Sequence, residues 1–99
     1  MKEIEAKEAK KFIGDKRYLF LDVREPEELM TKIKGAITIP LGDLSKNLNK
    51  ISKDKIVLIN CRSGVRSLKA CKILNDAGFK AYSLKGGIIA WENEKLPVE

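Results

Sequence analysis

The sequence predicts an α/β domain with a mainly parallel sheet and helices on both faces. Apolar, β-branched segments alternate with segments of helical periodicity along the whole chain, which is the order that βα units produce. The strand segments are almost continuously apolar, as expected for strands that are covered on both sides. With 99 residues the chain is long enough for one hydrophobic core and too short for two, so residues 1–99 are expected to form a single domain.

Strands are expected where apolar or β-branched runs stop at a polar residue, a glycine or a proline. In order along the chain, the expected strands are residues 2–5, 18–23, 36–39, 56–60 and 80–84, of which the first is short and mostly polar. The second and fourth runs lead into residues 22–24 (Asp-Val-Arg) and 60–62 (Asn-Cys-Arg). Ligands of open α/β sheets bind beyond the carboxyl ends of the strands, so we expect these two segments to converge on one site.

Helical segments are expected in the intervals between the strands. They are residues 6–13, a helix start at 25–28, a short helix at 41–48, residues 68–77 and residues 88–92. Gly14 and Gly78 follow two of these segments as C-terminal caps, and Pro26 lies in the first turn of another. Gly86 and Gly87 form a flexible turn that opens the last helix.

The charge pattern indicates a solvated surface. The chain carries 20 lysines and arginines against 14 acidic residues, a formal charge of +6. The lysines are spread out, with no basic block and no interleaved aromatic residues, which disfavours nucleic-acid binding. No apolar run has the length of a membrane span, and the N-terminus lacks the apolar core of a signal peptide. We therefore expect a cytoplasmic protein that binds neither nucleic acid nor membrane, and the size suits a monomer.

Two cysteines and the absence of histidine limit the chemistry. Cys61 is expected on a loop and Cys71 on the following helix, an arrangement that favours neither a structural disulfide nor a zinc site. Without histidine, Cys–His and Ser–His–Asp machinery is excluded. A nucleophile in this chain must be activated by its electrostatic surroundings, and we expect no metal or organic cofactor.

Residues 61–67 (Cys-Arg-Ser-Gly-Val-Arg-Ser) place a thiol between an apolar strand and a helix. Backbone amides at a helix N-terminus stabilise negative charge, and Gly64 allows the loop to turn its amides inward as an anion-binding nest. Two of the four arginines, Arg62 and Arg66, lie in this loop, which favours planar recognition of an oxyanion. The pattern predicts that Cys61 is a nucleophilic thiolate at the mouth of an anion-binding loop.

Both cysteines have a plainer interpretation as small buried apolar residues. For Cys61, the cationic and polar neighbours weigh against it. For Cys71, which shares a helical face with Leu68 and Leu74, core packing is favoured over the role of a resolving thiol.

Four segments in order resemble the rhodanese-like family, and the resemblance covers essentially the whole chain. They are residues 21–25 (Leu-Asp-Val-Arg-Glu), 33–40 (Ile-Lys-Gly-Ala-Ile-Thr-Ile-Pro), 61–67 and 86–91 (Gly-Gly-Ile-Ile-Ala-Trp). Many members carry histidine and asparagine in the second motif, where this chain has Lys32 and Thr38, a difference that we attribute to loop packing. The resemblance implies a five-stranded parallel sheet with helices on both sides, and sulfur transfer through a persulfide on Cys61.

The resemblance also implies that the loop amides and arginines hold the substrate. The substrate-binding candidates are Arg62, Ser63, Gly64, Val65, Arg66 and Ser67. In a supporting layer, Asp22 is expected to cap or pair locally, whereas Arg24 either adds positive potential near the anion or braces loops. Lys85 either borders the pocket or is solvated, and Trp91 and the glycine pair are expected to serve helix packing and a tight turn.

Three functions are compatible with these residues. The favoured one is a sulfurtransferase in which Cys61 takes sulfur from a small-molecule donor, such as thiosulfate or polysulfide, and passes it to a thiol, cyanide or protein acceptor. A cysteine-dependent phosphatase or arsenate reductase fits less well, because the phosphatase loop is one residue longer between cysteine and arginine and commonly works with an aspartic acid for which no clear counterpart exists here. A non-catalytic binding module or redox sensor stays open, since an ionised thiol is readily oxidised. The physiological donor and acceptor are not defined by the sequence.

Overall fold

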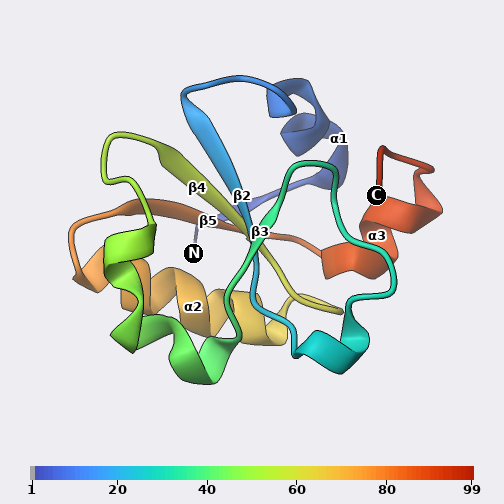
Figure 1. The fold of residues 1–99 in the computed structure, drawn as a ribbon. Coiled ribbons are helices and arrows are strands. Elements are labelled where there is room, and N and C mark those ends of the chain that lie inside the picture. The colour runs from blue at the N-terminus through green and yellow to red at the C-terminus, as the bar shows by residue number, and fades with distance from the viewer. Residues whose placement is uncertain (1) are drawn as a thin grey trace.

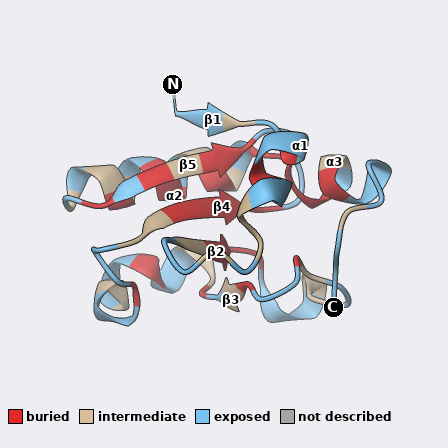
Figure 2. Ribbon diagram, turned by 90° about the horizontal axis from the view of Figure 1, so that it is seen from above, coloured by how far each residue is buried: buried red, intermediate tan, exposed pale blue. Residues whose placement is uncertain are grey.

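The computed structural model describes residues 2–99 and contains a five-stranded sheet in the order β1-β5-β4-β2-β3. The strands are β1 (Glu3–Ile4), β2 (Tyr18–Asp22), β3 (Ile37–Thr38), β4 (Ile56–Asn60) and β5 (Lys80–Leu84). All four neighbouring pairs are parallel, which confirms the predicted α/β class. In Figure 2 the strands lie side by side, with the buried strands β4 and β5 near the middle and the largely exposed β1 at one edge.

Helices and 3-10 turns connect the strands and cover both faces of the sheet. The elements are α1 (Ala6–Ala9), η1 (Lys10–Phe12), η2 (Pro26–Glu28), η3 (Leu41–Lys46), η4 (Leu48–Lys50), α2 (Val65–Asp76) and α3 (Gly87–Asn93). Figure 1 shows α2 with η3 and η4 on one side of the sheet, and α1 on the other side with α3 beside the strand ends. Because parallel strands need such crossovers, each strand is followed by a segment that can be packed against a face.

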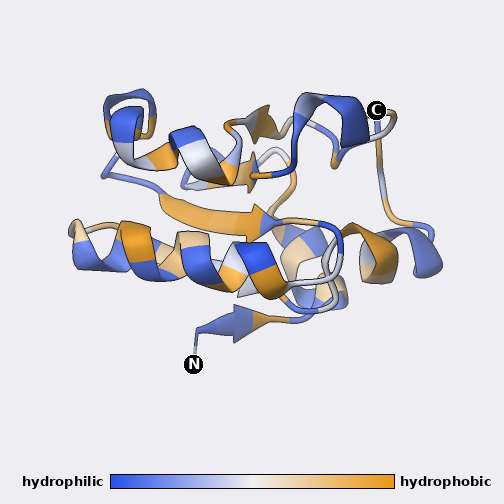
Figure 3. Cartoon of the chain, turned by 90° about the horizontal axis from the view of Figure 1, so that it is seen from below, coloured by the Kyte–Doolittle hydropathy of each residue, from blue (hydrophilic) through white to orange (hydrophobic). Residues whose placement is uncertain are grey.

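The face of the sheet that α2 covers has its own apolar core. Val57 and Ile59 of β4 pack there with Leu74 of α2 and Leu44 of η3, and all four side chains are buried. Figure 3, seen from this side, shows α2 running alongside an apolar strand of the sheet. Cys61 belongs to the same cluster, so the end of β4 is fixed by the core itself.

The opposite face is packed by α1 and α3. Phe20 and Leu58 belong to one buried apolar cluster with Ala9 of α1 and Trp91 of α3. The rings of Phe20 and Trp91 meet edge to face with their centroids 5.9 Å apart, a favourable geometry for aromatic pairs. Trp91 is fully buried, which agrees with its expected role in helix packing.

Several predicted helices differ in type or extent. The helix expected at 6–13 is a short α1 followed by a 3-10 turn, and the helix expected at 41–48 consists of the 3-10 segments η3 and η4. The start predicted at 25–28 is the single 3-10 turn η2. The helix expected at 68–77 begins earlier, at Val65, so the second half of the loop is helical.

Candidate active site

Cys61 follows the last residue of β4, at the carboxyl edge of the sheet. In the neighbouring strand Asp22 pairs in register with Asn60, and Asn60 Nδ2 donates to Asp22 Oδ2 at 3.2 Å. The two strand ends that the sequence predicted to converge therefore do so.

Polar hydrogens surround the sulfur of Cys61. The backbone amide of Gly64 donates to Sγ at 3.1 Å, the amide of Ser67 donates at 3.4 Å, and Ser67 Oγ lies 3.6 Å from Sγ. Gly64 has a φ of 110°, a left-handed conformation that side-chain-bearing residues rarely adopt. This conformation turns its amide toward the sulfur, so the predicted nest is present.

Hydrogen bonding outweighs desolvation at the thiol. Burial raises the pKa of Cys61, but the hydroxyl of Ser67 and the amides of Ser67, Gly64 and Ser63 lower it, and the net pKa is below the ordinary value. Cys61 is only 1% exposed, whereas the sequence suggested a thiol at the mouth of the loop. Cys61 is buried because it belongs to the apolar core between the sheet and α2. The polar residues that follow it in the loop gave no sign of this burial.

The two loop arginines have different surroundings. The Nη atoms of Arg66 bind the two carboxylate oxygens of Glu28 at 2.7 and 2.8 Å, and this pairing holds the pKa of Glu28 at about 2. Arg62 is exposed and makes no hydrogen bond or ion pair through its guanidinium within residues 2–99. Of the two arginines that the sequence predicted to bind the substrate, Arg62 is thus the one without an ion pair within the described residues. Val65, 64% exposed, adds only its backbone to the loop.

Arg24 braces the loop after β2. Its guanidinium binds Asp22 Oδ2 at 2.8 Å and donates to the carbonyls of Glu28 at 2.9 Å and Thr31 at 2.6 Å. Arg24 and Asp22 are both buried. The local pairing expected of Asp22 is present, and of the two roles considered for Arg24 the geometry supports loop bracing, since its donors face protein acceptors.

Three residues at the site were not identified from the sequence. Asn60 links the β2 end to Cys61, since its Nδ2 also lies 3.3 Å from the Cys61 carbonyl. Ser83 of β5 contacts Ser67 through its hydroxyl at 2.7 Å. Gly87 packs so closely on the carbonyls of Cys61 and Arg62 that a Cβ there would overlap them. Asn60 had a usable signal, a polar residue at a strand end, whereas Ser83 and Gly87 depend on contacts distant in sequence.

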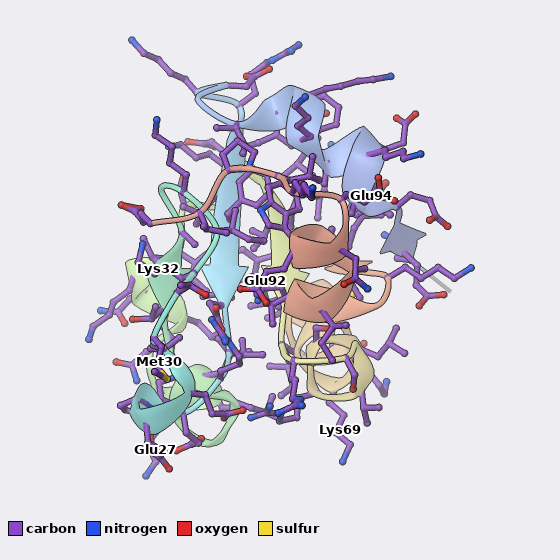
Figure 4. All side chains as sticks on the ribbon, turned by 90° about the vertical axis from the view of Figure 1, so that its right-hand side faces the viewer. Glu27, Met30, Lys32, Lys69, Glu92 and Glu94 are labelled. Carbon is purple, nitrogen blue, oxygen red and sulfur yellow. The ribbon has the colours of Figure 1, made fainter. Side chains whose placement is uncertain are left out.

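A cleft of about 450 Å³ adjoins the loop on the Arg62 side. Figure 4 shows Glu27 and Met30 near η2 on one side of this cleft and Glu92 of α3 on the other. Met30 is 92% exposed, so the entrance combines apolar and charged groups.

Comparisons with known proteins show which sequences and folds this chain is similar to. The rhodanese-like domain model matches residues 5–94. YtwF of Bacillus subtilis (strain 168) is 39% identical over 99 residues, covering 98% of this chain and 96% of YtwF. A protein of Allochromatium vinosum named sulfurtransferase is 39% identical over 82 residues, covering 81% of this chain and 77% of its own length. The crystal structure of a rhodanese-related protein from Thermoplasma volcanium has a TM-score of 0.92 at 34% identity and covers 100% of this chain and 98% of its own.

The chain belongs to the rhodanese-like domain family. In the second motif of this rhodanese-like chain, Lys32 and Thr38 stand where many family members have histidine and asparagine. Lys32 Nζ donates to the Ala36 carbonyl at 2.8 Å and binds Glu99 Oε1 at 2.9 Å, and Thr38 is exposed on β3. The Lys32 side chain therefore links its own loop to the C-terminal segment, which agrees with the loop-packing role expected from the sequence.

Other predicted residues of the rhodanese-like domain lie away from the sulfur. Lys85 is 3.6 Å from Glu5 in an exposed ion pair. Cys71 is buried, and burial raises the pKa of its thiol, in agreement with a core role. Within residues 2–99, no group of three or more His, Cys, Asp or Glu side chains is placed to hold a metal ion, and every helix is too short or too polar to span a bilayer.

Proposed function

We propose that this chain is a sulfurtransferase that moves sulfane sulfur from a donor such as thiosulfate or polysulfide to a thiol, cyanide or protein acceptor through a persulfide on Cys61. The observation that carries the proposal is the set of hydrogen-bond donors on Cys61 Sγ, formed by the amides of Gly64 and Ser67 with the Ser67 hydroxyl beside them. A thiolate is the reactive form of cysteine, and these donors favour it.

The reaction has two balanced steps. In the first, the Cys61 thiolate attacks the outer sulfur of thiosulfate, an S–S bond forms on Cys61, and the S–S bond of the donor breaks with release of sulfite. In the second, an acceptor thiolate or cyanide attacks the outer sulfur of the Cys61 persulfide. The acceptor leaves with that sulfur, and the Cys61 thiolate is restored.

The same loop suits the persulfide. Its terminal sulfur carries negative charge, and inward amides stabilise such charge without reorganising during the reaction. Arg62, which is exposed and unpaired within residues 2–99, is available to the oxyanion of the donor. Cys61 itself is 1% exposed, so the donor has to reach the sulfur through the loop that carries the exposed residues Arg62 and Ser63.

Intact-mass measurement tests the proposal directly. After incubation with thiosulfate or polysulfide, the protein is expected to gain about 32 Da, one sulfur atom, and to lose it on treatment with a reducing thiol. Cys61→Ser should prevent the gain. Cys71→Ser is the matched control, because Cys71 is the other buried cysteine and lies in the core; this variant should keep the gain and lose some stability.

Two results would contradict the proposal. If no sulfane donor adds mass while an aryl phosphate is turned over, the chain is a cysteine-dependent phosphatase. If no donor adds mass and Cys61 instead cycles between thiol and sulfenic acid with dilute peroxide, the chain is a redox sensor.

A further inference from the structure

Two fully buried hydroxyl groups meet behind Cys61. Ser67 comes from the first turn of α2 and Ser83 from β5, both side chains are 0% exposed, and their Oγ atoms are 2.7 Å apart. Ser83 lies in register with Ile59 on β4, two residues before Cys61, and this register brings its hydroxyl beneath the loop.

The positions of the two hydroxyl protons follow from the available acceptors. Within residues 2–99, Ser83 Oγ has Ser67 Oγ as its one hydrogen-bond partner. A buried donor without an acceptor is unfavourable, so the Ser83 proton points to Ser67 Oγ. The Ser67 proton then has two acceptors within reach, the Gly64 carbonyl at 3.1 Å and Cys61 Sγ at 3.6 Å.

We propose that Ser83 is a positioning residue whose hydroxyl donates to Ser67 and so makes the Ser67 hydroxyl a stronger hydrogen-bond donor to the Cys61 thiolate. While Cys61 is a thiol, its S–H donates to Ser67 Oγ, and the Ser67 hydroxyl donates to the Gly64 carbonyl. When Cys61 loses its proton to solvent, the Ser67 hydroxyl turns to the sulfur, and the bond from Ser83 is kept in both states. As a role in catalysis the inference rests on the proposed function, but the relay itself is measured without a sulfur donor.

Most charged groups around the site are paired with one another and make no contact with the Ser83 hydroxyl. On α2, Arg66 is paired with Glu28 of η2; on β2, Asp22 is paired with Arg24. After β5, Lys85 is paired with Glu5. Arg62, in the loop, is exposed. On β1, Glu3 is in register with Ser83. On α2, burial raises the pKa of the Cys71 thiol, and the backbone of Ser83 acts against this shift. None of these side chains bonds to the hydroxyl of Ser67 or Ser83, so reading alkylation at Cys61 alone isolates the hydroxyl relay.

The test is the pH dependence of Cys61 alkylation by iodoacetamide, followed by mass at the Cys61 peptide. Ser83→Ala should raise the midpoint by about 0.5 to 1 unit, which is a loss of about 3- to 10-fold in rate below the midpoint, with the high-pH rate unchanged. Ser83→Thr and Ser83→Val form a matched pair of equal shape. Threonine should keep the wild-type midpoint and valine should raise it, so the comparison remains decisive if the alanine variant is unstable.

A double-mutant cycle shows whether the effect passes through Ser67. In a Ser67→Ala background, Ser83→Ala should shift the midpoint no further, because the relay has already been removed. An equal shift in both backgrounds would overturn the relay, and so would a Ser83→Val midpoint equal to that of Ser83→Thr. A purely structural role would lower the unfolding midpoint in urea and leave the alkylation midpoint unmoved. If the wild-type protein transfers no sulfur but the Ser83 and Ser67 variants shift the alkylation midpoint as expected, the proposed function is wrong and the relay stands.

Discussion

A buried thiol ionises only if nearby groups replace the solvation that water would provide. At Cys61 that replacement comes from fixed backbone amides and one hydroxyl, while the nearest arginine on α2 is engaged with Glu28. The sequence predicted a joint contribution of amides and arginines. The amides of Gly64 and Ser67 were predictable because they follow Cys61 in the chain, but the partner of Arg66 comes from a distant turn.

The Arg66–Glu28 pair makes stability depend on pH. The pKa of Glu28 is lowered to about 2 from an ordinary 4.5, chiefly by its hydrogen bond from Arg66. A carboxyl group whose pKa is lower in the folded state stabilises that state fully at pH values above its pKa in the unfolded chain. This contribution is lost as the pH falls through its pKa in the folded state. Glu28→Gln should therefore be less stable than wild type at pH 7 by about 0.5–1 kcal/mol, since the pair is partly exposed.

Urea unfolding at several pH values measures this difference. It should be constant above a pH of about 4.5 and vanish as the pH approaches about 2. Glu27→Gln is the matched control, because Glu27 is the exposed neighbouring glutamate of η2, and it should show little change at any pH. A Glu28→Gln difference that persists unchanged near pH 2 would show that the carboxylate charge is not its source.

At the level of elements, the strands were easier to predict than the helices. The inner strands β2 and β4 carry continuous apolar residues that are mostly buried, so the sequence signal of these strands is local. The start of α2 is different, because Val65 faces solvent, Arg66 faces Glu28 and Ser67 faces the sulfur. These three residues show no apolar periodicity, and the first turn of α2 therefore could not be recognised. The leucines of residues 41–48 have a spacing that suits both an α-helix and a 3-10 helix.

The N-terminus of α3 supports the loop from below. The amide of Ile88 donates to the Cys61 carbonyl at 2.9 Å, and the amide of Ile89 donates to the Arg62 carbonyl at 3.2 Å. Gly87 permits this approach, because its φ is 59° and a Cβ would overlap both carbonyls. Docking of α3 thus fixes the backbone of the residue that carries the nucleophile.

Gly87→Ala should uncouple α3 from the loop. We expect a loss of about 3 kcal/mol in unfolding free energy, from the left-handed φ together with the overlap, and a lower rate of Cys61 alkylation. Gly14→Ala separates the two causes, because Gly14 has a φ of 78° and nothing within 4 Å of its Cβ position. That control should lose about 1–2 kcal/mol and keep the alkylation rate. Equal losses in both variants, with unchanged alkylation, would show that α3 does not support the loop.

For the whole molecule, the site joins the end of β2, the loop after β4, β5 and the start of α3. The four family-like segments include three of these, so most of the site could be located from the sequence. Ser83 could not, because its place beneath the loop depends on the register between β4 and β5. A serine within an apolar strand gives no indication of which buried hydroxyl or sulfur it will face.

The net charge of the molecule should influence its reaction with anionic donors. The chain carries a formal charge of +6, and such a field attracts a dianion such as thiosulfate over distances comparable with the Debye length. If the proposed function holds, kcat/KM for thiosulfate should fall several-fold as NaCl is raised from about 20 mM to about 500 mM, since salt shortens that length from roughly 20 Å to roughly 4 Å. Dimethyl trisulfide, an uncharged sulfane donor, serves as the control and should react at a rate independent of salt. The ratio of the two rates removes any general effect of salt on the fold. If both donors slow to the same extent, the surface charge does not guide the donor, and the local amides and Arg62 alone account for anion selection.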